Sequence, residues 1–190
     1  MQDSLRLKPL GYWCNTRDNP MAEPRVAVFH GEPVPDEDLD MSAAELVPLP
    51  HPQSMVDPAR HCLDRPRILR YLRSGWTFAS YEGFSYCRFG CTRDDGQGCR
   101  DLTDGHWVWP EGLAHYVEQH DVSLPDVFLD SLRSQNWQMP PAEGVSVRVQ
   151  RFRKLRSRLE RVGKVRGTWD LFDWSVWIAW AEACKRGKPA

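Results

Sequence analysis

The sequence has no run of apolar residues long enough to cross a membrane. A spanning helix needs about 20 consecutive, mostly apolar residues, whereas this chain of 190 residues has a mean hydropathy of −0.58 and 27% charged residues. Its first residues also lack the basic and apolar regions of a secretory signal peptide. We therefore expect a cytoplasmic protein without a membrane span, whose six cysteines are thiols or metal ligands rather than disulfides.

Signatures of common enzymes are missing as well. The sequence contains no glycine-rich phosphate-binding loop, no nucleophile elbow and no His-Glu-x-x-His motif. Helix-turn-helix, paired zinc-finger and RNP-type motifs, which would indicate a nucleic-acid binder, are absent too. These absences favour a protein that binds a partner over an enzyme.

Basic residues are absent from one long segment near the N-terminus. Residues 31–58 hold seven acidic residues and no Lys or Arg. Nine of the fifteen prolines precede residue 59, and proline disfavours long helices because it lacks an amide donor and restricts its neighbour. We predict that residues 1–62 form a Pro-rich, acidic, extended arm that wraps over the rest of the molecule. Its apolar anchors would be Leu39, Met41, Leu46, Val47 and Leu49.

The remaining pattern predicts an α+β fold with a small mixed centre of short strands and a C-terminal helical pair. A compact module is expected over residues 63–138, and a basic amphipathic helix followed by a Trp-rich helix over 139–190, all within one globular unit. Strands are expected at 25–29, 76–86 and 106–109, and helices at 65–74, 110–120, 126–134, 145–162 and 168–186.

A cysteine cluster gives the strongest metal signal. Cys87, Cys91 and Cys99 follow one another with three and seven intervening residues, and His106 comes seven residues later. Soft thiolates with an imidazole suit a tetrahedral Zn²⁺ ion, which would be structural because four protein ligands leave no open position. The alternatives are thiols without a metal, or a three-ligand site from which His106 points away.

Asp104, Glu111 and His115 form a second group of candidate functional residues. Glu111 and His115 stand four apart on one face of the predicted helix, and with Asp104 they could serve a metal-dependent hydrolase. The structural interpretation is a turn at Asp104, an acidic residue in a helix first turn, and a helical Glu–His pair.

The stretch around these residues resembles a motif of uncharacterised bacterial proteins, written LTDG-x-W-x-WPEGL-x-HYV. In this chain it runs from Leu102 to Val117, and upstream residues from Tyr71 and Tyr86 belong to it. The resemblance covers about residues 68–130 and implies a module used in different contexts. It carries over no activity and no catalytic role.

Charge and tryptophan are both concentrated near the C-terminus. From Arg148 to Arg166 there are nine basic residues and one acidic residue, so this segment carries +8 and the remainder −9 of the net −1. The basic helix could bind an anionic partner through residues such as Arg151 and Arg158, or be covered by the acidic arm. In the last helix, Trp174, Trp177 and Trp180 share one face, which could bind a partner or pack in the core.

Taken together, these features predict a non-enzymatic binding protein of an accessory, inhibitor or immunity type, with a zinc-stabilised module and a protein partner. The alternatives are a metal-dependent hydrolase that uses Asp104, Glu111 and His115, and a nucleic-acid binder that uses the basic helix 148–166. The oligomeric state does not follow from the sequence.

Overall fold

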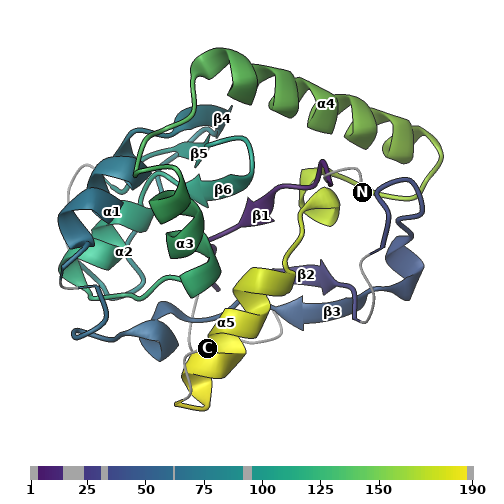
Figure 1. Cartoon of the computed structure of the whole chain (residues 1–190). Helices are drawn as coiled ribbons and strands as arrows, with labels where there is room; N and C mark the ends of the chain where they lie inside the picture. Colours follow the sequence, from purple (N-terminus) through teal and green to yellow (C-terminus); the bar gives the residue numbers. More distant parts are fainter. Residues whose placement is uncertain (1–3, 15–23, 31–33, 62, 92–95, 188–190) are drawn as a thin grey trace.

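The structure is a computed structural model that describes residues 4–14, 24–30, 34–61, 63–91 and 96–187. It has the predicted α+β fold, with a small mixed sheet, helices on its sides and two helices at the C-terminal end (Figure 1). The strands are β1 (Lys8–Pro9), β2 (Arg25–Val28), β3 (Glu45–Pro48), β4 (Trp76–Ser80), β5 (Arg100–Thr103) and β6 (Trp107–Pro110). The α-helices are α1 (Arg65–Arg73), α2 (Leu113–Gln119), α3 (Asp126–Ser134), α4 (Ala142–Arg161) and α5 (Ser175–Lys185).

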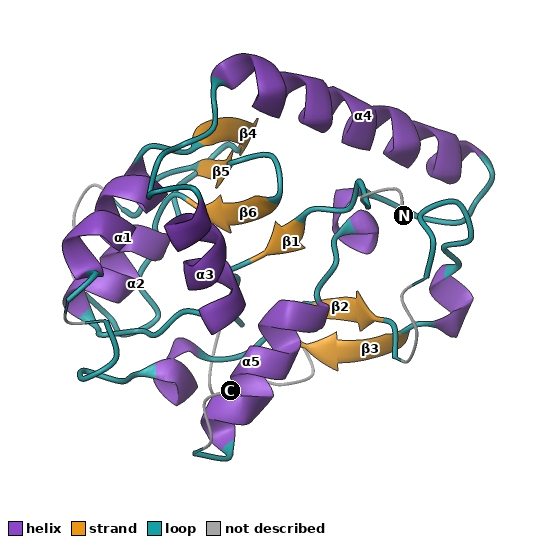
Figure 2. Cartoon of the chain, viewed as in Figure 1, coloured by secondary structure: helices purple, strands orange, loops and turns teal. Residues whose placement is uncertain are grey.

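The central sheet has the strand order β1-β6-β5-β4, in which β1 runs parallel to β6 and the other pairs are antiparallel. Strand β6 lies inside the sheet, and its residues Trp107, Val108 and Trp109 are all buried. A strand that is apolar at consecutive positions must be covered on both faces. Helices α1, α2 and α3 gather beside the sheet (Figure 2). Phe128 of α3 packs edge-on against Trp107.

The described part of the N-terminal segment joins the central sheet through β1 and also forms a small separate sheet. Strand β2 falls at the predicted strand and pairs antiparallel with β3. Leu39 and Leu49 are buried anchors, whereas Leu46 is 54% exposed because it points away from the core in the β2–β3 hairpin. The prediction of Leu46 as an anchor is therefore wrong.

Helix α4 buries one apolar stripe and crosses one side of the molecule next to β4 (Figure 1). The stripe consists of Val145, Val149, Phe152, Leu155 and Leu159. This spacing of three and four residues is the one the sequence predicts for an amphipathic helix.

The tryptophans of the last helix pack in the core. Trp174, Trp177 and Trp180 are 1%, 0% and 4% exposed, so they present no surface to a partner and the core interpretation of this face is correct. The indole of Trp177 donates to the Tyr12 carbonyl at 3.1 Å. Helix α5 starts at Ser175 rather than after Thr168, because Asp173 accepts from the Ser175 amide and hydroxyl at 3.3 and 2.7 Å.

A single cluster of buried apolar side chains includes residues from the N-terminal arm, the central module and the C-terminal helices. None of the described helices is both long enough and apolar enough to cross a membrane.

Candidate metal centre

Four side chains with metal-binding atoms converge beside α2. They are Cys87, Cys91, His115 and His120, and one ligand atom from each lies within 4.8 Å of all the others. The His120 Nε2 atom lies 3.2 Å from the Cys87 sulfur, 2.9 Å from the Cys91 sulfur and 3.1 Å from Nε2 of His115. Within the described ranges, no other cluster of three or more His, Cys, Asp or Glu side chains is close enough to share an ion.

The two cysteines stand on a tight turn. The Gly90 amide donates to the Cys87 carbonyl at 3.1 Å, and Gly90 has a φ of +76°, which glycine adopts readily. The Phe89 amide points at the Cys87 sulfur at 3.4 Å. Metal ions bind the thiolate form of cysteine.

One histidine comes from the first turn of α2 and the other from its C-terminal cap. His115 lies within the helix, and His120 is its C-terminal cap, whose amide donates to the Tyr116 carbonyl at 3.2 Å. The cap has a φ of −129°, so it leaves the helical path and its ring turns back toward His115. Two histidines five positions apart, which would diverge on a regular helix, therefore meet at their Nε2 atoms.

Aromatic residues hold the cysteine turn against α2. The Phe89 ring stacks on His120 with centroids 4.2 Å apart and planes 16° apart. The Arg88 amide donates to the Tyr116 hydroxyl at 2.9 Å. Burial raises the pKa of Tyr116 to about 12, so it stays a neutral acceptor. Burial also lowers the pKa of His120, against the opposing charge of Asp121, which favours the neutral imidazole that metal binding requires.

The loop that carries the cysteines is held by residues that are at most partly buried. No described residue from Tyr81 to Cys99 is buried, and Cys87 and Phe89 pack against the core with part of their surface exposed. The Ser85 amide bonds the Gly98 carbonyl at 3.0 Å and the Gln97 amide bonds the Ser85 carbonyl at 2.8 Å, so the loop base is paired. A segment without buried apolar groups gains little from the hydrophobic effect, so the Cys/His group is the feature best placed to hold it.

The structure brings together Cys87 and Cys91 of the predicted set but places Cys99 and His106 elsewhere. Cys99 precedes β5, and its carbonyl accepts from the Tyr81 amide at 2.8 Å. His106 lies in the turn between β5 and β6, where its amide bonds Asp104 at 2.8 Å. In their place the metal group uses His115 and His120.

The sequence contained a signal for these histidines. Structural zinc sites commonly combine a Cys pair separated by two to four residues with a His pair separated by three to five. Cys87 and Cys91 are separated by three residues and His115 and His120 by four. The interpretation of His115 as a helical partner of Glu111 leaves this combined spacing of a Cys pair and a His pair unrecognised.

Asp104, Glu111 and His115 do not form a common site in the structure. Asp104 is 2% exposed and accepts from the Tyr71 hydroxyl and the Trp107 amide at 2.8 and 2.7 Å, so it fixes the β5–β6 turn. Glu111 pairs with Arg100, which lowers the pKa of Glu111 and keeps it ionised. Only His115 belongs to the metal group.

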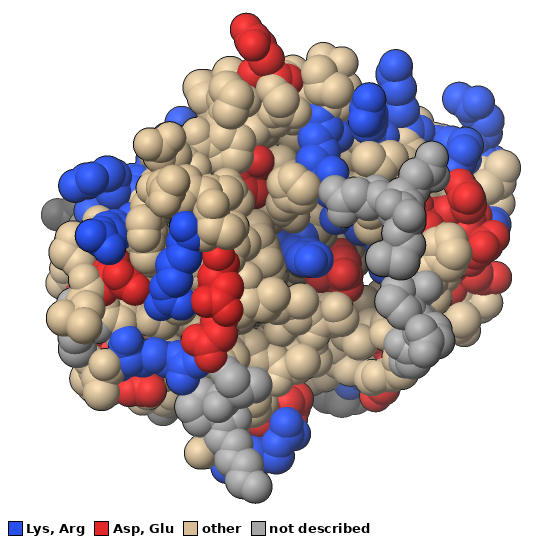
Figure 3. Space-filling model, in the orientation of Figure 1, with Lys and Arg blue, Asp and Glu red and all other residues tan. Residues whose placement is uncertain are grey.

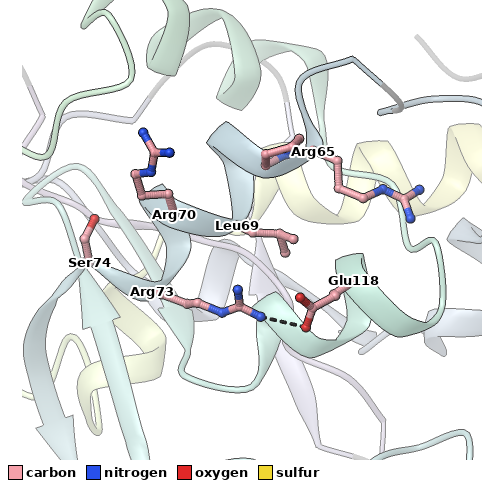
Figure 4. A pocket seen from close by; sticks show the side chains of 7 residues that line it. Arg65, Leu69, Arg70, Arg73, Ser74 and Glu118 are labelled. Carbon is pink, nitrogen blue, oxygen red and sulfur yellow. Dashed lines mark hydrogen bonds and ion pairs between the residues drawn. The ribbon is translucent and has the colours of Figure 1, made fainter.

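The described surface also has one open hollow beside α1, lined by α1 residues and Glu118 of α2 (Figure 4). Arg73 pairs with Glu118 at 2.6 Å there, and Arg65 pairs with Asp121 at 2.5 Å. Carboxylates thus occupy two of the three guanidinium groups that line the hollow, the third being Arg70. The predicted binding residues Arg151 and Arg158 are exposed on α4, remote in sequence from this hollow.

Comparisons with protein-family models, curated proteins and solved structures found no match to this chain. The metal group and the surfaces around it are therefore interpreted from their own chemistry.

Proposed function

We propose that the chain is a non-enzymatic binding protein whose central module is held together by a structural zinc ion. The observation that carries this proposal is the convergence of Cys87, Cys91, His115 and His120 on one point.

The donor set suits zinc. Two thiolates and two imidazoles in a tetrahedral arrangement are a common structural zinc shell, whereas magnesium and calcium prefer oxygen ligands. Around zinc, ligand atoms of this kind stand roughly 3.3–3.8 Å apart. The separations from His120 Nε2, 2.9–3.2 Å, are somewhat shorter than this, and all four ligand atoms lie within 4.8 Å of one another. Small side-chain movements would suffice for coordination.

The same donor set argues for a structural role. Four protein ligands fill a tetrahedral shell and leave no position for a water or a substrate. The ion would join the loop of Cys87 and Cys91, which lacks buried residues, to α2, which is anchored in the core through Leu113 and Val117.

A hydrolase at Asp104, Glu111 and His115 has less support. Asp104 is engaged by Tyr71 and backbone amides, and Glu111 by Arg100. The expected effect of Glu111→Gln is a loss of about 1 kcal/mol of stability from the broken, partly exposed ion pair. A hydrolytic activity that Glu111→Gln abolished without lowering the melting temperature would contradict the proposal.

The binding partner that the sequence predicts, another protein, stays a prediction. The Trp face of α5 is unavailable for it because Trp174, Trp177 and Trp180 are buried. The strongest remaining surface feature is the exposed basic side of α4.

Metal analysis of the purified protein tests the zinc site. We expect one zinc per chain, lost or strongly weakened in Cys87→Ala, Cys91→Ala, His115→Ala and His120→Ala, with a lower melting temperature in each. Cys99→Ala and His106→Ala are the matched controls, since both residues lie outside the group, and both should keep the zinc. A chain purified without metal that binds no added zinc, or one that loses zinc on replacement of Cys99, would refute this site.

A further inference from the structure

The outer side of α4 carries a row of exposed cations. Arg151, Lys154, Arg158 and Arg161, here called the basic row, are all exposed. Their spacing of three, four and three residues places them along one side of the helix, away from the buried stripe. At 1.5 Å per residue the row is about 15 Å long. Figure 3 shows basic side chains projecting from this edge of the molecule.

The basic row is not neutralised by the rest of the described chain. Its four side chains make no ion pair or hydrogen bond with the residues that the structure places. Other basic residues of the segment are engaged: Arg156 pairs with Glu160 at 3.3 Å, and Arg153 donates to the Phe78 carbonyl at 3.0 Å. The basic row thus differs from Arg153 and Arg156 in having no ion-pair or hydrogen-bond partner among the described residues.

The described part of the N-terminal arm contacts both ends of this segment, outside the basic row: Arg148, before the row, donates to the Ser4 carbonyl at 2.6 Å. Lys164, beyond the row, donates to the Glu37 carbonyl at 2.8 Å. Asp36 of the arm faces Arg6 at 3.6 Å rather than α4. The described part of the arm therefore leaves the basic row open to an external anion.

The residues on the exposed side of α4 indicate which class of anionic partner the basic row can bind. Protein interfaces are depleted of charge at their centres and use aromatic and apolar anchors, whereas the row has only Val147 and Val162 exposed near its ends. Membrane-surface helices insert an apolar face, but the apolar stripe of α4 is buried in the protein. Interfaces with nucleic acids, in contrast, are polar and strongly positive.

We propose that the basic row binds the phosphate backbone of a nucleic acid. This inference names the partner of the binding function proposed above and rests on it. Three of the four residues are Arg, whose guanidinium group can bind a phosphate through two parallel hydrogen bonds. A row of about 15 Å runs past roughly four phosphates of one strand at 3.4 Å of duplex axis each. Because contacts to phosphates carry no base information, the binding would be largely independent of base sequence.

The test is a salt series with a fluorescently labelled duplex DNA of about 20 base pairs and the zinc-containing full chain. Four phosphate contacts predict that affinity falls about 10²-fold between 50 and 200 mM salt. The triple variant Arg151→Gln, Lys154→Gln, Arg158→Gln should bind more weakly at 50 mM and lose only about 3- to 4-fold over the same range. Arg67→Gln, Arg73→Gln, Arg133→Gln is the matched control: it removes the same charge from arginines that are paired with carboxylates, and should bind like the parent.

Three outcomes would overturn the inference. They are no binding at 50 mM salt, equal weakening in both triple variants, and equal affinity for a poly-glutamate of the same charge, which would assign the row to acidic proteins. Zinc content is measured on the same samples. Loss of DNA binding with zinc retained contradicts the nucleic-acid partner alone, whereas absence of zinc contradicts the metal site.

Discussion

A buried histidine should make folding stability depend on pH. His61 is 6% exposed, and its Nε2 accepts a hydrogen bond from the Leu124 amide at 2.9 Å, so this nitrogen must be unprotonated. Burial, reinforced by the nearby charges of Arg60 and Arg65, lowers the pKa of His61 to about 4. The unfolded chain takes up this proton near pH 6.5, before the folded chain does.

Above about pH 6.5, His61 does not make the free energy of unfolding depend on pH. As the pH falls from there toward 4, His61 lowers the free energy of unfolding by an amount on the order of 3 kcal/mol. Denaturant titrations from pH 7.5 to 4 should show this loss, and His61→Gln, which keeps an acceptor without the charge, should reduce it. His30→Gln, at an exposed site, serves as the control. An unchanged pH slope in His61→Gln would show that other groups cause the acid sensitivity.

Gly98 shows how one residue supports the loop of the metal centre. Its φ is +86°, and a Cβ added there would collide with the Glu111 carboxylate that pairs with Arg100. Gly98→Ala combines backbone strain with displacement of that ion pair, for an expected loss of about 2 kcal/mol. Gly83→Ala has a similar φ of +94° and open space at the Cβ, so it measures backbone strain alone. Equal losses in the two variants, measured by chemical denaturation, would exclude the steric contribution.

At the scale of single elements, α5 depends on its tryptophans. Trp177 is fully buried, stacks edge-on against Trp13 with centroids 5.0 Å apart, and bonds the Tyr12 carbonyl. Trp177→Ala should cost about 3–5 kcal/mol through the cavity it leaves. Trp76→Ala removes an indole that is 43% exposed, so it should cost much less. A thermal unfolding series compares them, and similar shifts in melting temperature would argue against α5 as a core element.

Elements with local signals could be predicted from sequence, and those fixed by distant contacts could not. Helix α3 occupies 126–134 as expected, because Pro125 precedes it and Phe128 and Leu132 give it an apolar face. On the same helix Val127, next to the buried Phe128, is 50% exposed. The parallel pairing of β1 with β6 joins residues about a hundred positions apart, and nothing in the local pattern of Lys8–Pro9 indicates it.

The same distinction between local signals and distant contacts holds for the candidate metal site. Cys87 and Cys91 could be identified because a short turn places both sulfurs together whatever the surrounding fold. His115 and His120 meet them only because the end of α2 turns its cap inward and Phe89 stacks on it. That arrangement depends on the docking of the loop against α2, which is a tertiary contact.

At the scale of the whole molecule, removing the metal should loosen one region and spare another. A chelator should raise amide exchange in the loop 81–99 and at the C-terminal end of α2, where the group joins them. Helix α4 should keep its protection because its five buried apolar residues are independent of the site. Hydrogen-exchange mass spectrometry with and without chelator measures this, with Cys99→Ala as a control that responds like the parent. Uniform loss of protection across the chain would indicate a global rather than a local role for the ion.

The position of the N-terminal segment also sets the order in which the molecule can be completed. Its residues 7–12 lie between β6 and the C-terminal elements: the Leu10 amide bonds the Val108 carbonyl, the Leu7 carbonyl accepts from Asp173, and the Tyr12 carbonyl accepts from Trp177, 165 positions away. During synthesis Leu7 and Tyr12 leave the ribosome long before Asp173 and Trp177, because Trp177 lies 165 positions after Tyr12. Until those later residues have been made, Leu7 and Tyr12 stay without these partners. That interval is when a nascent chain of this protein is most exposed to aggregation or to capture by a chaperone.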